Sequence, residues 1–262
     1  MFSNALCDLH SFTSHASFFV SIHHEIVNRG FLKKSIVLGC GLVDMYAKCG
    51  MLAKAQQCHD NISFRSVISW NSLISGYSQQ GQGHEALKCF EQMQDNGLSP
   101  NSVTFICILN ACRIIKDLDK GKQIHEEVVS RGLLEKDIGI GFALVDMYAK
   151  CGAIEKAKRV FDDLPIRDIV SWNSLISGCS QPGGDEETLK CLGSINGEGF
   201  FPNAITFTCF LKACGSTGAI EKGKQIHDEI ANSGLLVNNA VLGGALVDMY
   251  AKFGMLAKAQ EV

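Results

Sequence analysis

The sequence is dominated by one internal repeat with a period of 102 residues. The string GLVDMYAKCG at 41–50 returns as ALVDMYAKCG at 143–152 and as ALVDMYAKFG at 245–254. SWNSLISGYSQ at 69–79 and GKQIHEEVVSRGLL at 121–134 also return 102 residues later with few changes. Self-similarity at a long fixed period is typical of repeat architectures, so the 262 residues are expected to form an array of small units rather than one closed globule.

Each period contains three similar stretches, and each stretch has two helix-like apolar patterns separated by a glycine break. In one of them Leu144, Met147 and Tyr148 follow helical spacing, and Gly152 is placed to end that helix. Pro165 ends the helix that follows. No stretch alternates with period two for long enough to form a sheet, which predicts an all-α chain.

A single helical hairpin of about 34 residues cannot bury its own apolar face and is stable only when it stacks on neighbours. The predicted fold is therefore a right-handed superhelical α-solenoid of stacked helix-turn-helix repeats. In a typical second helix, Ala157 is expected to permit close approach and Phe161 to fill the space one turn later. The expected units are 1–35 (divergent and partial), 36–66, 67–101, 102–137, 138–168, 169–203, 204–239 and 240–262 (truncated).

Composition excludes several classes of protein. The balance of 24 Lys and Arg against 27 Asp and Glu gives a net charge of −3, which argues against strong nonspecific binding to nucleic acid. No apolar run reaches the length of a transmembrane helix, and residues 1–20 contain neither Lys nor Arg, so they match no secretory signal and are a poor transit peptide. The 12 cysteines are expected to be reduced thiols at packed positions, since disulfide frameworks belong to short secreted chains.

Residues 36–262 resemble the plant pentatricopeptide repeat proteins, in particular the PLS subgroup with alternating motif lengths. The resemblance rests on SWNSLISGYSQ followed by SPN at 69–101, NACR with GKQIHEEVVSRG at 110–132, and ALVDMYAKCGAIEKAKRVFDDLPIRD at 143–168. It includes no counterpart of the terminal E or DYW domains, so the chain is expected to be a fragment. The resemblance implies P-type motifs at 67–101 and 169–203, S-type at 36–66, 138–168 and 240–262, and L-type at 1–35, 102–137 and 204–239.

The resemblance implies single-stranded RNA recognition at about one base per repeat. In the family, the fifth and last residues of a motif contact the base edge, and an apolar second residue packs on the base face. In 67–101 these positions are Asn71, Asn101 and Ile68. In 169–203 they are Asn173, Asn203 and Val170. An amide carries both a donor and an acceptor, and a pair of Asn residues implies a pyrimidine preference with cytosine favoured.

The remaining motifs depart from that pattern. The fifth residue of the 31-residue units is Cys40, Phe142 or Gly244, none of which can make the amide contact. The 36-residue units carry Ile106 with Asp137 and Thr208 with Asn239, and the Thr–Asn pair resembles one that reads adenine.

Each candidate residue also has an ordinary structural interpretation. Asn71 and Asn173 could cap a helix near its start, and Ile68 and Val170 could be core residues. The H-x-E strings beginning at His23, His125 and His227 match half of a zinc-deaminase signature, but no C-x-x-C completes it. Because Cys49 recurs as Cys151 but becomes Phe253, packing is favoured over metal binding at that position.

The leading hypothesis is a non-enzymatic RNA-binding adaptor that functions in transcript processing or C-to-U editing. By resemblance its place is the mitochondrion or chloroplast, and its partners are organellar single-stranded RNA and editing-complex proteins or a deaminase supplied in trans. We expect no cofactor, metal, membrane or small-molecule partner. Two alternatives are a peptide-binding solenoid and a decayed fragment; the second is suggested by residues that weaken the helix after 180, namely Pro182, Gly183, Gly184, Gly193 and Gly197.

Overall fold

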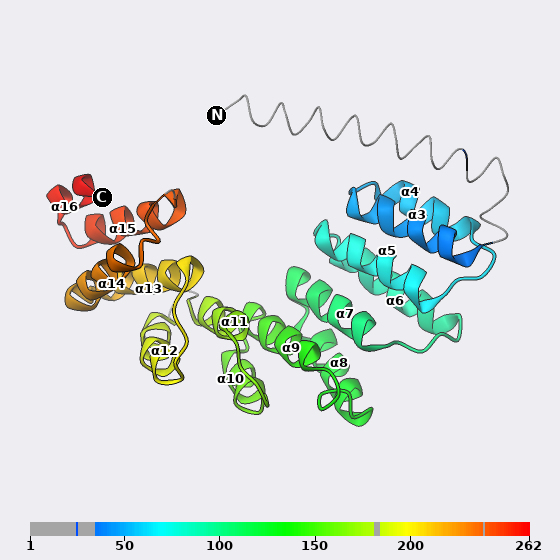
Figure 1. The fold of residues 1–262 in the computed structure, drawn as a ribbon. Helices are drawn as coiled ribbons and strands as arrows, with labels where there is room; N and C mark the ends of the chain where they lie inside the picture. The colour runs from blue at the N-terminus through cyan, green and yellow to red at the C-terminus, as the bar shows by residue number, and fades with distance from the viewer. Residues whose placement is uncertain (1–24, 26–34, 181–183, 238) are drawn as a thin grey trace. The chain divides into compact units, whose positions relative to one another are not determined.

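The computed structural model describes residue 25 and residues 35–180, 184–237 and 239–262 (Figure 1). Within these ranges the chain forms fourteen α-helices and no strand, which confirms the all-α prediction. The chain divides into two compact units, Met1–Ile115 and Lys116–Val262. The expected first motif at 1–35 lies outside the described residues except for Glu25 and Ser35.

Each unit consists mainly of antiparallel helix pairs joined by short turns. The first unit contains α3 (Ile36–Lys48), α4 (Leu52–Asn61), α5 (Val67–Gln79), α6 (Gly83–Asp95) and α7 (Ser102–Ile115). The second contains α8 (Leu118–Ser130), α9 (Ile138–Lys150), α10 (Ile154–Asp162), α11 (Ile169–Cys179), α12 (Asp185–Gly197), α13 (Ala204–Thr217), α14 (Ile220–Ser233), α15 (Ala240–Lys252) and α16 (Leu256–Glu261). No helix among the described residues is long and apolar enough to cross a membrane.

Glycine ends the first helix of many pairs, as the sequence predicted. After α9, Gly152 has a φ of +80°, a left-handed conformation that glycine adopts without strain. The next residue then closes the turn, because the Ala153 N–H donates to the Tyr148 carbonyl at 2.9 Å. The chain therefore reverses within three residues, which brings α10 back along α9.

First helices pack side by side into a continuous row within each unit. In the first unit α5 lies between α3 and α7, and in the second the order is α9, α11, α13 and α15. Glycines permit close approach of neighbouring helices in this row: a Cβ added to Gly76 of α5 would lie 2.7 Å from the Cβ of Ala47 in α3. Gly178 of α11 meets Ala149 of α9 in the equivalent way.

Second helices cover one side of this row and complete the core. Ala157 and Phe161 of α10 are both buried, as predicted. Phe161 meets the indole of Trp172 in α11 edge to face, with ring centroids 4.6 Å apart. The weakened helix expected after 180 does form, as α12, although Pro182 and Gly183 lie outside the described residues.

The equivalent position in the first unit holds a histidine instead of a phenylalanine. His59 is fully buried and meets Trp70 at 4.2 Å between centroids. Among the described residues, neither its ring nitrogens nor the Trp70 Nε1 has a hydrogen-bond partner, and the nearest Asp60 carboxylate oxygen is 3.8 Å from His59 Nδ1.

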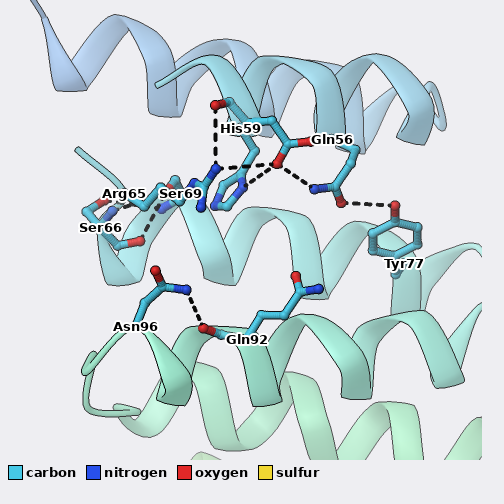
Figure 2. Close-up of polar contacts among 9 residues, drawn as sticks. Gln56, His59, Arg65, Ser66, Ser69, Tyr77, Gln92 and Asn96 are labelled. Atoms are coloured by element: carbon cyan, nitrogen blue, oxygen red, sulfur yellow. Dashed lines mark hydrogen bonds and ion pairs between the residues drawn. The ribbon is translucent and has the colours of Figure 1, made fainter. Parts of the chain in front are cut away.

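Figure 2 shows His59 with the surrounding polar groups. Tyr77 donates to Gln56, Gln56 donates to Asp60, and Asn96 donates to the Gln92 carbonyl of its own helix (Figure 2). The second unit differs at the residue equivalent to Asn96: Glu198 accepts a hydrogen bond from Trp172 Nε1 at 3.0 Å and pairs with Arg167. The first unit therefore lacks an acceptor that the second unit supplies.

Candidate nucleic-acid interface

The structure brings Asn71 and Asn101 together, although they are 30 residues apart. Asn71 lies one turn into α5 and is mostly buried, and its Nδ2 donates to Asn101 Oδ1 at 3.1 Å. A third residue completes the cluster, because the hydroxyl of Thr104 in α7 donates to Asn71 Oδ1 at 2.7 Å. Resemblance pointed to the two amides, but it gave no role to Thr104.

The second unit contains a similar cluster at Asn173, Asn203 and Thr206, in which the threonine hydroxyl joins the two amides. The Thr206 hydroxyl lies 2.6 Å from Asn173 Oδ1 and 3.1 Å from Asn203 Oδ1. With the motif bounds expected from the sequence, both clusters join the fifth residue of one motif, the last residue of that motif, and the third residue of the next one.

Asn101 and Asn203 are also the residues that begin the following helices. Asn101 Oδ1 accepts the N–H of Thr104 at 3.0 Å, and Asn203 Oδ1 accepts the N–H groups of Ile205 and Thr206. These bonds satisfy amides that have no partner inside the helix. Equivalent residues cap the other first helices, namely Ser35 for α3, Ser66 for α5, Asp137 for α9, Asp168 for α11 and Asn239 for α15.

The capping interpretation of Asn71 and Asn173 is therefore wrong. Ser66 caps α5 and Asp168 caps α11, each through a reciprocal capping box with the residue three positions on. Asn71 and Asn173 lie beyond the first turn, and their side chains point to the neighbouring motif instead of their own helix end.

The capping bonds fix which atoms the amides present. Because Asn101 Oδ1 receives the Thr104 N–H, its Nδ2 must point away from the helix end. One N–H of the Asn71 amide donates to Asn101, and the amide oxygen accepts a hydrogen bond from Thr104. The second N–H of the Asn71 amide is therefore left available to a ligand. The unused groups of this cluster are therefore mainly N–H donors, which suit a ligand edge that carries acceptors.

Ile68 and Val170 lie on the surface, so the core interpretation of these residues is wrong. Their exposed fractions are 67% and 59%. Both are the second residue of a first helix, two positions after its cap, where the side chain points away from the packed row. Four further β-branched residues at the same offset from a cap are exposed and were missed by the sequence analysis, namely Val37, Val103, Ile205 and Val241.

The motifs that depart from the Asn–Asn pattern do not form such clusters. Cys40 Sγ lies 3.4 Å from Ser66 Oγ, so this pair meets without an amide. The Thr208 hydroxyl donates to the Ala204 carbonyl of its own helix at 2.7 Å, while Asn239 caps α15. No bond between Thr208 and Asn239 is found in the described part of the chain.

Comparison with known proteins identifies the hairpins. The model of the PPR repeat family matches residues 65–113, that of the pentatricopeptide repeat domain matches 156–217, and that of the PPR repeat matches 205–235. A chloroplastic pentatricopeptide repeat-containing protein of Arabidopsis thaliana is 37% identical over 239 residues, which is 91% of this chain. Residues 65–113 and 156–235 are pentatricopeptide repeats.

A mitochondrial pentatricopeptide repeat-containing protein of the same plant is 35% identical over 241 residues. The chain spans little more than a third of these relatives, 38% of each. Among solved structures, the pentatricopeptide repeat protein PPR10 in complex with an 18-nt psaJ RNA element matches 94% of this chain and 36% of its own, with a TM-score of 0.78 at 18% identity. That likeness confirms the α-solenoid fold.

The histidines of the repeats pack against tyrosines of the following motif. His125 Nδ1 lies 2.9 Å from the Tyr148 hydroxyl, and His227 Nδ1 lies 2.8 Å from the Tyr250 hydroxyl. His23 and His24 lie outside the described residues. Burial lowers the pKa of His125, with a smaller contribution from Lys156, so the neutral ring is favoured there.

The cysteines of the repeats lie at packed positions. None of those described forms a disulfide, and seven are buried. Burial raises the pKa of Cys58 to about 11 and that of Cys89 to about 12, which keeps both thiols protonated and unreactive. No group of three metal-ligating side chains occurs among the residues that the structure describes.

Proposed function

We propose that this chain is a sequence-selective adaptor for single-stranded RNA, reading roughly one base per repeat. The observation that carries the proposal is the recurring cluster of two amides beside an exposed β-branched residue, Asn71 and Asn101 with Ile68 in one motif and Asn173 and Asn203 with Val170 in the other. Amides provide directional contacts to a base edge, and an exposed aliphatic side chain provides a surface for the base face.

The chemistry of the site supports a base that presents acceptors. Two adjacent N–H donors match the N3 and O2 atoms of cytosine, whereas uracil has an N3–H donor between its two acceptors. The family resemblance implies a pyrimidine preference with cytosine favoured for such a pair of Asn residues, and the two donors are compatible with it. The proposal treats 67–101 and 169–203 as P-type motifs, with 36–66, 138–168 and 240–262 as S-type and 102–137 and 204–239 as L-type.

The biological setting is part of the same proposal. Relatives named chloroplastic and mitochondrial support an organellar location, and the RNA bound to PPR10 supports RNA as the ligand. The chain would position an organellar transcript for processing or C-to-U editing without catalysing either reaction. A deaminase or another editing-complex protein would then be supplied in trans.

Selection from a randomised pool of short single-stranded RNA tests the proposal. We expect enrichment of pyrimidines three positions apart, because the two Asn–Asn motifs are three motifs apart in the sequence. The double variant Asn71→Ala and Asn173→Ala should lose that enrichment. A pool that shows no enrichment, or enrichment that ignores both substitutions, would contradict base reading and favour a peptide ligand.

Affinity should be modest and only weakly dependent on salt. The 24 Lys and Arg are outnumbered by 27 Asp and Glu, so the chain as a whole offers no net positive charge to attract phosphates. A steep loss of binding between low and physiological salt would instead indicate a backbone-dominated mode.

A further inference from the structure

We propose that Thr104 and Thr206, each contributed by the following motif, are positioning residues that fix the orientation of the base-reading amides. This inference rests on the proposed function. Both side chains are fully buried, and each hydroxyl contacts the fifth residue of the preceding motif, Asn71 at 2.7 Å and Asn173 at 2.6 Å. Selectivity of one motif would thus depend on a residue of the next.

Counting donors and acceptors shows why the hydroxyl fixes the amide. Thr104 Oγ1 accepts the backbone N–H of Asn101 at 3.2 Å and has a single proton to donate. The shorter of its two possible bonds goes to Asn71 Oδ1, at 2.7 Å against 3.0 Å to Asn101 Oδ1. The proton is therefore assigned to Asn71, which turns the Asn71 NH₂ group toward Asn101.

The reverse orientation of Asn71 would bring two oxygens together. Asn101 Oδ1 is held in place by the Thr104 N–H, so it cannot turn away. A flipped Asn71 would place its own oxygen about 3.1 Å from that oxygen, in the position that Nδ2 occupies now. Thr104 and the cap together leave one orientation, in which donors face outward.

The orientation of the amide at the fifth position depends on the threonine more strongly in the second unit than in the first. Within the described residues, Thr206 supplies the one hydrogen bond to the Asn173 side chain, whereas Asn71 is also bonded to Asn101. Removing the Thr206 hydroxyl should release the Asn173 amide to rotate. Removing the Thr104 hydroxyl should release Asn71 only in part.

The chain also offers matched controls at the same position of other motifs. Ser69 and Ser171 are buried third residues, but their hydroxyls donate back to the cap carbonyls of Ser66 and Asp168 at 2.9 and 2.8 Å. Neither hydroxyl contacts a base-reading amide. Substituting them disturbs a capping box without touching the proposed site.

The test compares affinities for homopolymeric single-stranded rC, rU and rA of equal length, using the full chain and fluorescence anisotropy. We expect Thr206→Val to lower the ratio of rC to rA affinity roughly five-fold, the size of one hydrogen bond. Thr104→Val should lower it less. Thr206→Ser should restore the ratio, because it returns the hydroxyl, and Ser171→Ala should leave the ratio unchanged.

Comparison with the asparagine variants separates the two levels of the proposal. If Asn173→Ala loses the discrimination while Thr206→Val keeps it, the positioning role is overturned and base reading stands. If Asn71→Ala and Asn173→Ala both leave the ratio unchanged, base reading itself is overturned. Should Thr206→Val reduce the helical circular dichroism signal, Thr206→Ala, which adds no volume, replaces it with the same expected outcome.

Discussion

The Nδ2 of Asn71 donates a hydrogen bond to Oδ1 of Asn101 at 3.1 Å, and the same Asn101 oxygen caps α7. One atom therefore serves both the fold and the candidate site. Substitutions at this position must be chosen so that a loss of helix stability is not mistaken for a loss of recognition.

A pair of variants at Asn101 separates the two roles. Asn101→Ala should lower the free energy of unfolding by about 1 kcal/mol, because the Thr104 N–H loses its cap. Asn101→Asp keeps the oxygen and should keep stability within about 0.5 kcal/mol, yet it replaces the outward NH₂ with an acceptor. Urea unfolding measures the change in stability. The ratio of the affinities for rC and rA measures the change in base preference. An Asp variant with unchanged base preference would contradict a contact at Asn101.

Exposed aliphatic residues should affect binding but not folding. Ile68→Ser and Val170→Ser are expected to change stability by less than about 0.5 kcal/mol, since both side chains already face solvent. Affinity for RNA should fall several-fold as the stacking surface is lost. Ile74→Ala is the control. Truncating this buried side chain should lower the free energy of unfolding by about 2–5 kcal/mol. A clear loss of thermal stability in Ile68→Ser would show that the residue is packed.

Supplying the missing acceptor near Trp70 should stabilise the first unit. Asn96→Glu reproduces the second unit, where Glu198 accepts the Trp172 Nε1–H. We expect a gain of about 1 kcal/mol, the usual value of one satisfied hydrogen bond. Asn96→Gln tests whether the effect needs the charge. Thermal unfolding followed by circular dichroism provides the measurement, and an unchanged or lower melting temperature would contradict the assignment.

Stability should fall in acid because of His59. Burial, with a smaller contribution from Arg65, lowers the pKa of His59 to about 4, while Asp60 opposes the shift. In the unfolded chain the same ring takes up its proton near its usual pKa of about 6.5, so unfolding binds a proton in between. The contribution of neutral His59 is therefore complete above about pH 6.5 and is lost as pH falls to about 4, by up to about 3 kcal/mol.

His59→Phe should remove that part of the pH dependence, since phenylalanine occupies the equivalent place in the second unit at Phe161. The difference in unfolding free energy between the two proteins, measured from pH 7 to pH 4, isolates this residue from the carboxylates. A constant difference would contradict the lowered pKa.

Replacing glycine by alanine should raise stability where the new Cβ has open space and lower it where a neighbouring helix is in close contact. A Cβ at Gly193 of α12 meets nothing within 4 Å, so Gly193→Ala should stabilise the helix by up to about 1 kcal/mol. Gly178→Ala should destabilise, because its Cβ would overlap the Ala149 backbone and side chain. If both substitutions shift the melting temperature in the same direction, this distinction is contradicted.

Local chemistry explains how far sequence analysis reached. The end of α9 depends on neighbouring residues, in particular the left-handed Gly152 that follows it, and so it can be predicted from a short stretch of sequence. Ile68 was harder to interpret, because an isolated isoleucine in a helix does not reveal which face it occupies.

The sequence by itself determined the period, the hairpins and the all-α stacking, because each follows from apolar spacing and glycine breaks within about 34 residues. Only the tertiary structure decided which residues the amide side chains contact. Thr104 reaches Asn71 across 33 positions of chain, and Glu198 reaches Trp172 across 26. Such bonds depend on how one hairpin packs on the next, so no pattern within a single motif predicts them.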